Sequence, residues 1–389
     1  MKLEKYIDSQ LELVKKTNLL RTIDELNYPA ALWVEMNGKQ YLNLCSNNYL
    51  CYADHPEIKK AAIDAINSYG IGSTGSRLIT GTSLLHSQLE DKIAEFKGCE
   101  SAMFLSSGYV ANLSTISAIL NIDDVIFSDE LNHASIIDGI KLSRANKFIY
   151  KHNNMQHLET LLKDNRHKFN KSMIVTDSIF SMDGDMADLN SLIELKNKYN
   201  SFLMIDEAHA TGIIGKNGSG MASHLNVNNC IDISMGTFSK AAGVEGAYIS
   251  GSSKLIDYLR HYSRGFVFST APSPAIAGAI IKSIELMTND NFSRQKLWEN
   301  VAYFKNNLSS IAGLELIPNN SPIFCLIVGD TETTLLFQRQ LLEDYRIFIK
   351  AIRPPTVKSS RIRLCLNSQL TCKELDFIIN AIKSIYKKY

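Results

Sequence analysis

Short apolar runs alternate with helix-like segments through the middle of the chain, from about residue 101 to residue 250. The runs are apolar on both faces, which is typical of strands that helices cover on both sides of a sheet. The predicted strands are Ala102–Leu105, Val125–Ser128, Phe148–Tyr150, Met173–Thr176, Phe202–Ile205, Ile231–Ile233 and Ala247–Ser250. The predicted helices between them include Tyr109–Leu120, Ala134–Ala145, Leu158–Lys163 and Leu189–Lys198. This alternation predicts an α/β fold with a mostly parallel, seven-stranded sheet.

The two ends of the chain follow other patterns. Residues 1–26 have the spacing of a polar amphipathic helix, and after about residue 285 long helical patterns flank short strands. The expected C-terminal helices are Phe292–Ile311, Thr334–Tyr345 and Lys373–Tyr386, and the strands are Ile323–Val328, Ile347–Ala351 and Arg361–Leu366. We therefore expect an N-terminal helical segment (1–49), a large catalytic domain (50–285) and a small α+β domain (286–389).

Composition and charge argue against several classes of binding partner. The 389 residues include 41 Lys+Arg and 40 Asp+Glu, a net charge of +1 that gives no electrostatic reason to expect nucleic acid or an anionic membrane. The 7 cysteines are odd in number and form no Cys-x-x-Cys pair, which argues against a disulfide framework and a structural zinc site. No apolar stretch approaches the ~20 residues that a bilayer requires, and the N-terminus lacks a signal-peptide pattern. A small-molecule partner, no metal and a cytoplasmic location are expected.

Polar residues follow two of the predicted strands, at the edge where parallel sheets bind ligands. Ser107-Gly108-Tyr109 leads from a strand into a helix, whose first N–H groups favour an anion such as phosphate; a plain turn is the alternative. Asp206 and His209 follow another buried strand, where a carboxylate has few reasons to lie unless a cation meets it. A helix N-cap is the alternative for Asp206.

A lysine follows a third strand. Lys240 lies among Gly, Ser, Thr and Ala, with no acidic residue after it until Glu245. A tight apolar setting lowers the pKa of an amine, as Schiff-base chemistry requires, whereas a lone lysine is more often a solvated surface charge. The helix start, the Asp–His pair and the lysine all fall on strand ends of one sheet. Together they predict a pyridoxal 5′-phosphate (PLP) site.

Two further segments fit a PLP site. His133 follows the Val125–Ser128 strand and can lie flat on a cofactor ring; a satisfied histidine at a helix start is the alternative. Arg361 and Arg363 alternate along a predicted strand and so point to one face, where a guanidinium can bind a substrate carboxylate with two hydrogen bonds. A pair of surface charges on an edge strand is the alternative.

Seven ordered motifs run along the chain: Ser46–Leu50, Gly70–Gly81, Ser107–Tyr109, Leu131–Ser135, Phe180–Gly184, Asp206–His209 and Gly236–Lys240. Through these motifs the chain resembles, over essentially its whole length, the α-oxoamine synthase family of fold-type-I PLP enzymes. Three residues depart from the family pattern: Cys51 and Ser178 stand where glycine is common, and Glu207 where aspartate is common. None of the three removes a catalytic atom, so the departures affect the expected acyl-chain pocket and leave the expected chemistry intact.

Further runs point to one member of the family. Ala351–Val357 and Arg361–Arg363 resemble the biotin-pathway member, which condenses L-alanine with pimeloyl-CoA or a pimeloyl-acyl carrier protein. Ser128–Gly139 is also similar to the member that joins glycine and acetyl-CoA, which stays an alternative. A third hypothesis is an inactive scaffold subunit of the same fold, and the presence of Lys240 argues against it. The sequence leaves open whether coenzyme A or a carrier protein brings the acyl group.

The resemblance implies a role for each matching residue. Lys240 forms the internal aldimine, Asp206 pairs with the pyridine nitrogen, His209 approaches the phenolic oxygen and His133 stacks over the ring. Asn47 and Arg363 bind the amino-acid carboxylate. The other implied cofactor contacts are Gly108, Tyr109, Ser181 and Thr237, the other implied substrate contacts are Arg21, Thr356 and His133, and a homodimer is implied in which Ser269 and Thr270 reach the neighbouring chain's phosphate.

Overall fold

The structure is a computed structural model and describes residues 2–28 and 30–388. These residues form two compact units. Unit 1 comprises the chain up to Asn47, the short stretch Met182–Gly184, and the chain from Lys296 onward. Unit 2 comprises Asn48–Ser181 and Asp185–Gln295. None of the helices in the described part of the chain is long and apolar enough to cross a membrane.

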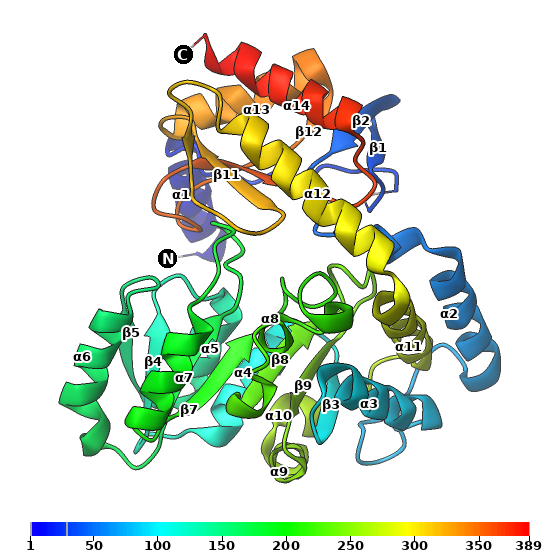
Figure 1. Ribbon diagram of the computed structural model, residues 1–389, viewed down its shortest axis with the longest axis vertical. Coiled ribbons are helices and arrows are strands. Elements are labelled where there is room, and N and C mark those ends of the chain that lie inside the picture. Colours follow the sequence, from blue (N-terminus) through cyan, green and yellow to red (C-terminus); the bar gives the residue numbers. More distant parts are fainter. Residues whose placement is uncertain (1, 29, 389) are drawn as a thin grey trace. The chain divides into compact units, whose positions relative to one another are not determined.

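Unit 2 is built on a seven-stranded sheet (Figure 1). Its strands, in spatial order, are β3 (Ser101–Leu105), β9 (Ala247–Gly251), β8 (Ile233–Thr237), β7 (Phe202–Asp206), β6 (Ser172–Asp177), β4 (Val125–Asp129) and β5 (Asn146–Tyr150). Only β9 runs against its two neighbours, while the remaining neighbouring strands are parallel. The predicted α/β class and the mostly parallel sheet are confirmed.

Helices of unit 2 cover both faces of this sheet. They are α2 (Pro56–Tyr69), α3 (Leu84–Lys97), α4 (Gly108–Ile119), α5 (Ala134–Ser143), α6 (Met155–Asn165), α7 (Leu189–Lys198), α8 (Met221–His224), α9 (Ser253–Tyr262), α10 (Arg264–Val267) and α11 (Pro274–Asn289). Met103 and Leu105 of β3 pack in one buried cluster with residues of α4, α5 and α9. Phe104 points to the opposite face, because side chains alternate along a strand, and its ring lies beside His86 of α3. The strands are therefore apolar on both faces.

One predicted strand of unit 2 is misplaced. The sequence predicts a strand at Ile231–Ile233, whereas β8 begins at Ile233 and includes Gly236 and Thr237. Glycine generally weakens a strand. Here Gly236 pairs with Tyr248, and a Cβ on Gly236 would lie 2.3 Å from the Tyr248 hydroxyl. The Tyr248 side chain occupies the space that a Cβ would need, so packing within the sheet, and not a turn, explains the glycine at this position.

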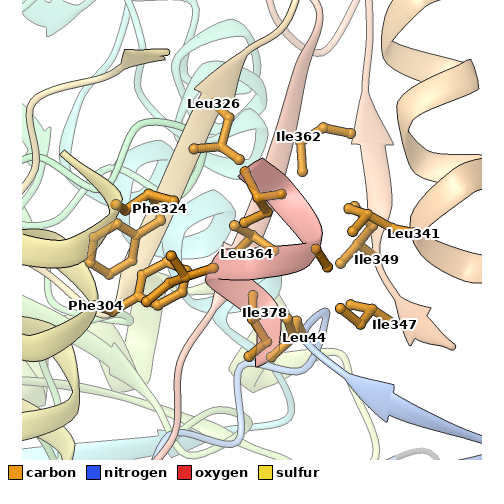
Figure 2. Close-up of a cluster of buried hydrophobic side chains, with 14 of the residues drawn as sticks. Leu44, Phe304, Phe324, Leu326, Leu341, Ile347, Ile349, Ile362, Leu364 and Ile378 are labelled. Atoms are coloured by element: carbon orange, nitrogen blue, oxygen red, sulfur yellow. The ribbon is translucent and has the colours of Figure 1, made fainter. Parts of the chain in front are cut away.

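Unit 1 contains two small sheets and the C-terminal helices. One sheet has the order β1 (Trp33–Met36), β2 (Lys39–Asn43), β12 (Ile347–Phe348), and the other has the order β10 (Glu315–Leu316), β11 (Ile323–Ile327), β14 (Arg361–Cys365), β13 (Lys350–Ile352). The helices are α1 (Leu3–Lys16), α12 (Asn291–Leu308, in this unit from Lys296), α13 (Thr331–Tyr345) and α14 (Cys372–Tyr386). Figure 2 shows the core of this unit, where Phe304, Phe324 and Leu364 lie among aliphatic side chains from both ends of the chain.

Two sequence predictions in unit 1 are wrong. The N-terminal segment is not helical throughout: after α1 it forms the β1–β2 hairpin, whose turn residues Asn37 and Gly38 both have positive φ. Asn-Gly is a strong hairpin signal that the helical interpretation passed over. The single strand expected at Ile347–Ala351 is two strands in different sheets, since β12 pairs with β2 and β13 pairs with β14.

Candidate active site

Two buried carboxylates end neighbouring parallel strands of unit 2. Asp177 closes β6 and Asp206 closes β7, and the two residues are direct partners in the register of the sheet. The hydrogen bonds that Asp206 accepts come from neutral groups, Asn112 Nδ2 at 2.8 Å and the Ala208 amide at 2.8 Å. Burial and the neighbouring Asp206 charge raise the pKa of Asp177 well above its ordinary value. A cation bound at this edge would therefore lower the energy of the site.

His133 and Lys240 lie in the electrostatic field of these carboxylates. His133 begins α5, and its backbone amide donates to Asp177 Oδ2 at 2.8 Å. Desolvation lowers the pKa of His133, Lys240 acts in the same direction, and Asp206 opposes both. The His133 ring is therefore neutral near pH 7. The structure thus brings together the three residues Asp206, His133 and Lys240, which the sequence took from three different strand ends.

His209, the fourth predicted catalytic residue, is buried beside another motif. Its Nδ1 lies 2.8 Å from the hydroxyl of Tyr49, within hydrogen-bond distance. Tyr49 belongs to the run Ser46–Leu50, and both rings are almost completely buried. The Tyr49 hydroxyl therefore fixes which way the His209 ring faces, a partnership that sequence spacing could not show.

The predicted phosphate site lies where α4 begins. Ser107 caps this helix by accepting a hydrogen bond from the Val110 amide at 3.3 Å. A Cβ on Gly108 would lie 3.7 Å from the Cβ of Thr237, so the helix start and the end of β8 are adjacent. The Thr237 hydroxyl donates to the Gly246 carbonyl at 2.7 Å, which fixes its side chain. The first N–H groups of a helix and a nearby hydroxyl are donors suited to phosphate.

The two other predicted cofactor residues of this edge, Tyr109 and Ser181, have different surroundings. The Tyr109 ring meets His133 edge-on at 6.5 Å, and its hydroxyl donates to Asp138. Ser181 follows Phe180, whose amide donates to the Asp185 carbonyl at 3.0 Å and so closes a loop. The structure therefore places Tyr109 beside His133 and Ser181 at the edge of a closed loop.

The side chain of His152 holds this loop in place, a role that the sequence did not predict. Its Nδ1 lies 3.0 Å from Asp129 and its Nε2 lies 2.8 Å from Asp185, while its ring stands edge-on to Phe180 at 4.4 Å. Burial lowers the pKa of His152, but the hydrogen bonds to both carboxylates outweigh it and raise the pKa to about 10. The ring is therefore protonated at neutral pH, and it links Asp185 to Asp129 at the end of β4.

Ser269 and Thr270 lie elsewhere in unit 2. Thr270 forms a β-bridge with Ser76, and the Ala271 amide donates to the Gly75 carbonyl at 2.9 Å. In the described part of the chain, neither residue is hydrogen-bonded to Gly108, Thr237 or Lys240 of the same chain. A role at the neighbouring chain's phosphate stays a prediction.

The predicted carboxylate-binding residues meet within unit 1, where Arg363 is buried and Asn47 is half-buried. Arg363 donates through Nη2 to Asn47 Oδ1 at 3.0 Å, and it is 8% exposed. Arg361 turns to other partners, an ion pair with Asp183 and a hydrogen bond to the Met182 carbonyl at 3.0 Å. The alternative of surface charges on an edge strand is wrong, because both arginines are buried and β14 has a neighbour on each side.

Arg21 and Thr356 also meet within unit 1. Arg21 Nη2 donates to Thr356 Oγ1 at 3.5 Å, and both residues are exposed. They line a cavity of about 560 Å³ together with the basic residues Lys15, Lys350 and Arg353. The cavity can accept an anionic ligand, and Lys350 is already paired with Asp24.

The three departures from the family pattern have structural explanations. Cys51 adopts a left-handed conformation, with φ of 60°, which explains why glycine suits this position. Ser178 lies fully buried and donates from its hydroxyl to the Asp206 carbonyl at 2.9 Å. Glu207 forms a buried ion pair with Lys97. Each departure is accommodated within unit 2, and none occupies the place of a residue expected to be catalytic.

The chain matches known proteins over nearly its full length. A profile described as aminotransferase class I and II matches residues 39–382. The chain belongs to the aminotransferase class I and II family. The resemblance predicted from the motifs is confirmed by an 8-amino-7-oxononanoate synthase from Thermoanaerobacter pseudethanolicus, which is 42% identical over 385 residues, 98% of this chain and 97% of that protein.

Solved structures agree with this assignment to the aminotransferase class I and II family. A crystal structure of 8-amino-7-oxononanoate synthase from Francisella tularensis is 29% identical, covers 90% of this chain and 97% of its own, and superposes with a TM-score of 0.78. A structure of SPT with a PLP internal aldimine is 24% identical, covers 100% and 99%, and gives a TM-score of 0.91. At that identity the second comparison shows that the two chains share a fold.

Proposed function

We propose that the protein is a PLP-dependent acyltransferase that condenses L-alanine with a pimeloyl thioester. The products are 8-amino-7-oxononanoate, CO2 and the free thiol, so the reaction is a step of biotin biosynthesis. The observation that carries the proposal is similarity over 98% of the chain, at 42% and 40% identity, to two 8-amino-7-oxononanoate synthases. Asp206, His133 and Lys240 at one sheet edge support the same chemistry.

The residues of unit 2 fit PLP. The start of α4, with Gly108, Tyr109 and Thr237, would hold the phosphate, and Ser181 and His209 would contact the rest of the cofactor. Asp206 would hold a proton on the ring nitrogen, because a buried carboxylate with neutral donors and a second carboxylate beside it favours a cation. Lys240 would attach the cofactor. When bound, PLP supplies an electron sink that stabilises negative charge at the amino-acid Cα.

Other residues of the chain bind the substrates and transfer the proton. Asn47 and Arg363 bind and orient the carboxylate of L-alanine through charge-assisted hydrogen bonds. The Lys240 amine takes the proton from Cα and later returns it, which is worth on the order of a hundredfold or more in rate. A neutral His133 can lie against the cofactor ring without adding a positive charge beside Asp206. Arg21 and Thr356 contact the acyl donor.

The assembly and location follow from the same resemblance. We propose a cytoplasmic homodimer in which Ser269 and Thr270 of one chain contact the phosphate held by its neighbour. Sedimentation of the purified protein, with and without PLP, tests the dimer.

The deciding experiment is turnover of L-alanine and of glycine, each with pimeloyl and acetyl thioesters. We expect the pair L-alanine and pimeloyl thioester to be preferred. Preference for glycine with acetyl-CoA would favour the alternative suggested by the run Ser128–Gly139, and no turnover with any pair would favour an inactive scaffold. Running the pimeloyl arm with coenzyme A and with acyl carrier protein identifies the carrier.

Two variants test the assigned roles. Lys240→Ala should lose at least a hundredfold in rate while the protein folds and binds PLP noncovalently. Lys254→Ala, an exposed lysine on α9, is the matched control and should retain wild-type turnover. Arg363→Ala should chiefly raise the KM for L-alanine, and an unchanged KM would refute the carboxylate assignment.

A further inference from the structure

A buried thiol lies beside the residues proposed to bind the substrate carboxylate. Cys365 follows Arg363 by two residues on β14, so both side chains leave the strand on the same face. Figure 2 shows Ile362 and Leu364 of the same strand in the hydrophobic cluster, on the other face. Cys365 is 1% exposed. Its sulfur therefore faces the polar side of the strand without being open to solvent.

Cys365, Arg363 and Asn47 form a closed triangle of hydrogen bonds. Arg363 Nη1 donates to Cys365 Sγ at 3.0 Å, and Nη2 donates to Asn47 Oδ1 at 3.0 Å. Cys365 Sγ in turn donates to Asn47 Oδ1 at 3.4 Å. Both terminal nitrogens of the guanidinium are thus tied within unit 1, which fixes the plane of the Arg363 head group.

The triangle requires a protonated thiol, and the surroundings supply one. Burial raises the pKa of Cys365 above its ordinary value, and Arg363 only partly opposes this effect. The thiol can therefore accept one hydrogen bond and donate another at neutral pH. Because two donors converge on Asn47 Oδ1, a flipped amide would bring its NH2 group against two other donors. The Nδ2 group of Asn47 is held on the opposite side.

We propose that Cys365 is a positioning residue for the amino-acid carboxylate site, holding the Arg363 guanidinium and the Asn47 amide in the orientation that receives the carboxylate. The inference rests on the proposed function, because it takes these two residues as the carboxylate site. It adds a residue that binds no substrate itself, and whose loss should weaken amino-acid binding more than the chemical step.

A second buried cysteine provides a matched control. Cys325 of β11 lies directly opposite Arg363 in the sheet and is fully buried. Its Sγ donates to the Met182 carbonyl at 3.0 Å, so its hydrogen bond goes to a residue outside the triangle. Cys325→Ala therefore removes the same atom from the same sheet at the same burial, without deleting a bond to Arg363 or Asn47. A purely structural effect of losing a buried sulfur should appear equally in both variants.

The experiment compares Cys365→Ala, Cys365→Val, Cys365→Ser and Cys325→Ala in the PLP-loaded enzyme. The Kd of L-alanine and of glycine is measured from the change in cofactor absorption, alongside KM and kcat with the pimeloyl thioester. We expect Cys365→Ala and Cys365→Val to raise the Kd and KM of the amino acid roughly tenfold, as loss of a bond to a charged group does. Their kcat should change less than about threefold, and Cys365→Ser should stay within about threefold of wild type, since a hydroxyl restores donor and acceptor.

The outcomes separate two failures. Unchanged Kd in both Cys365→Ala and Cys365→Val, or an equal rise in Cys325→Ala, overturns the positioning role. Valine fills the space of the thiol, so it keeps the test valid if the alanine variant is unstable. Wild-type enzyme that binds an amino acid but does not condense it with a pimeloyl thioester overturns the proposed function instead, while the Kd comparison still tests Cys365.

Discussion

The buried ion pair of Lys97 and Glu207 allows a quantitative test of how unit 2 is held together. Lys97 is 5% exposed and Glu207 is 0% exposed. Glu207 also accepts hydrogen bonds from the Ala222 amide at 3.0 Å and the Ser234 hydroxyl at 3.1 Å. Since Glu207 directly follows Asp206, the carboxylate ties the end of β7 to β8 and to α8. We propose Glu207→Gln as the perturbation, because it removes the charge and keeps the size.

The expected cost follows from the burial of the lysine. Burial alone lowers the pKa of Lys97, but the Glu207 carboxylate overcomes that effect and holds the pKa above its ordinary value. Without Glu207, a buried ammonium keeps only uncharged partners such as the Ser219 carbonyl. Removing one partner of a buried pair costs about 3–5 kcal/mol. At about 2–4 °C per kcal/mol for a unit of this size, the unfolding midpoint should fall by roughly 10 °C.

The assay is a double-mutant cycle followed by urea and thermal unfolding. Lys97→Met alone should cost a similar amount, because it leaves a buried carboxylate, whereas Lys97→Met with Glu207→Gln should recover most of the loss. In Glu207→Gln the pKa of Lys97 falls below its unfolded value, so the deficit should shrink as the pH rises toward 10. Single-variant costs below about 1 kcal/mol, or costs that simply add in the double variant, would refute the argument.

Substitutions at three other residues should change the stability of the folded protein in a stated direction. The pKa of His152 is about 10 in the folded protein and about 6.5 in the unfolded chain. Protonated His152 therefore stabilises the folded protein fully below pH 6.5, and this contribution is lost as the pH rises to 10. Urea midpoints should fall over that range more for wild type than for His152→Asn. Cys51→Gly should raise the free energy of unfolding by up to about 1 kcal/mol, since relief of left-handed strain exceeds the added chain entropy; a lower urea midpoint would contradict this. Gly236→Ala should cost about 1–3 kcal/mol, because its Cβ would collide with the buried Tyr248 hydroxyl; wild-type stability would show that the ring moves aside freely.

The sequence located the strands of unit 2 because each is a short apolar run between helical segments. The apolar pattern gave the wrong bounds for β8 because Gly236 and Thr237 do not continue the apolar run, and only their pairing with β9 makes them part of the strand. It missed the β1–β2 hairpin although Asn37-Gly38 is a direct signal. Local pattern thus found the elements that bury both faces. It failed at the end of β8, where pairing with the next strand decides the bounds, and at the β1–β2 hairpin, where a local turn signal was overlooked.

The same distinction applies to the candidate site. Asp206, His133 and Lys240 each follow a recognisable strand, so topology alone brought them to one edge. Asn112, which donates to Asp206, and Asp177, which lies beside it, depend on the register between β6 and β7 and on the rotation of α4. No pattern within a single segment fixes register or rotation, so these partners could be identified only from the structure.

Because β9 runs against β8, Lys240 lies in a short connection between two adjacent antiparallel strands. The connection closes on itself: the Phe238 amide donates to the Gly246 carbonyl at 2.9 Å, and the Val244 amide donates to the Phe238 carbonyl at 2.9 Å. A residue inserted here would have to break these bonds or shift the ladder of β8 and β9. For protein engineers this is a poor site for circular permutation or for a fused domain, whereas the exposed turn at Asn37-Gly38 is a better one.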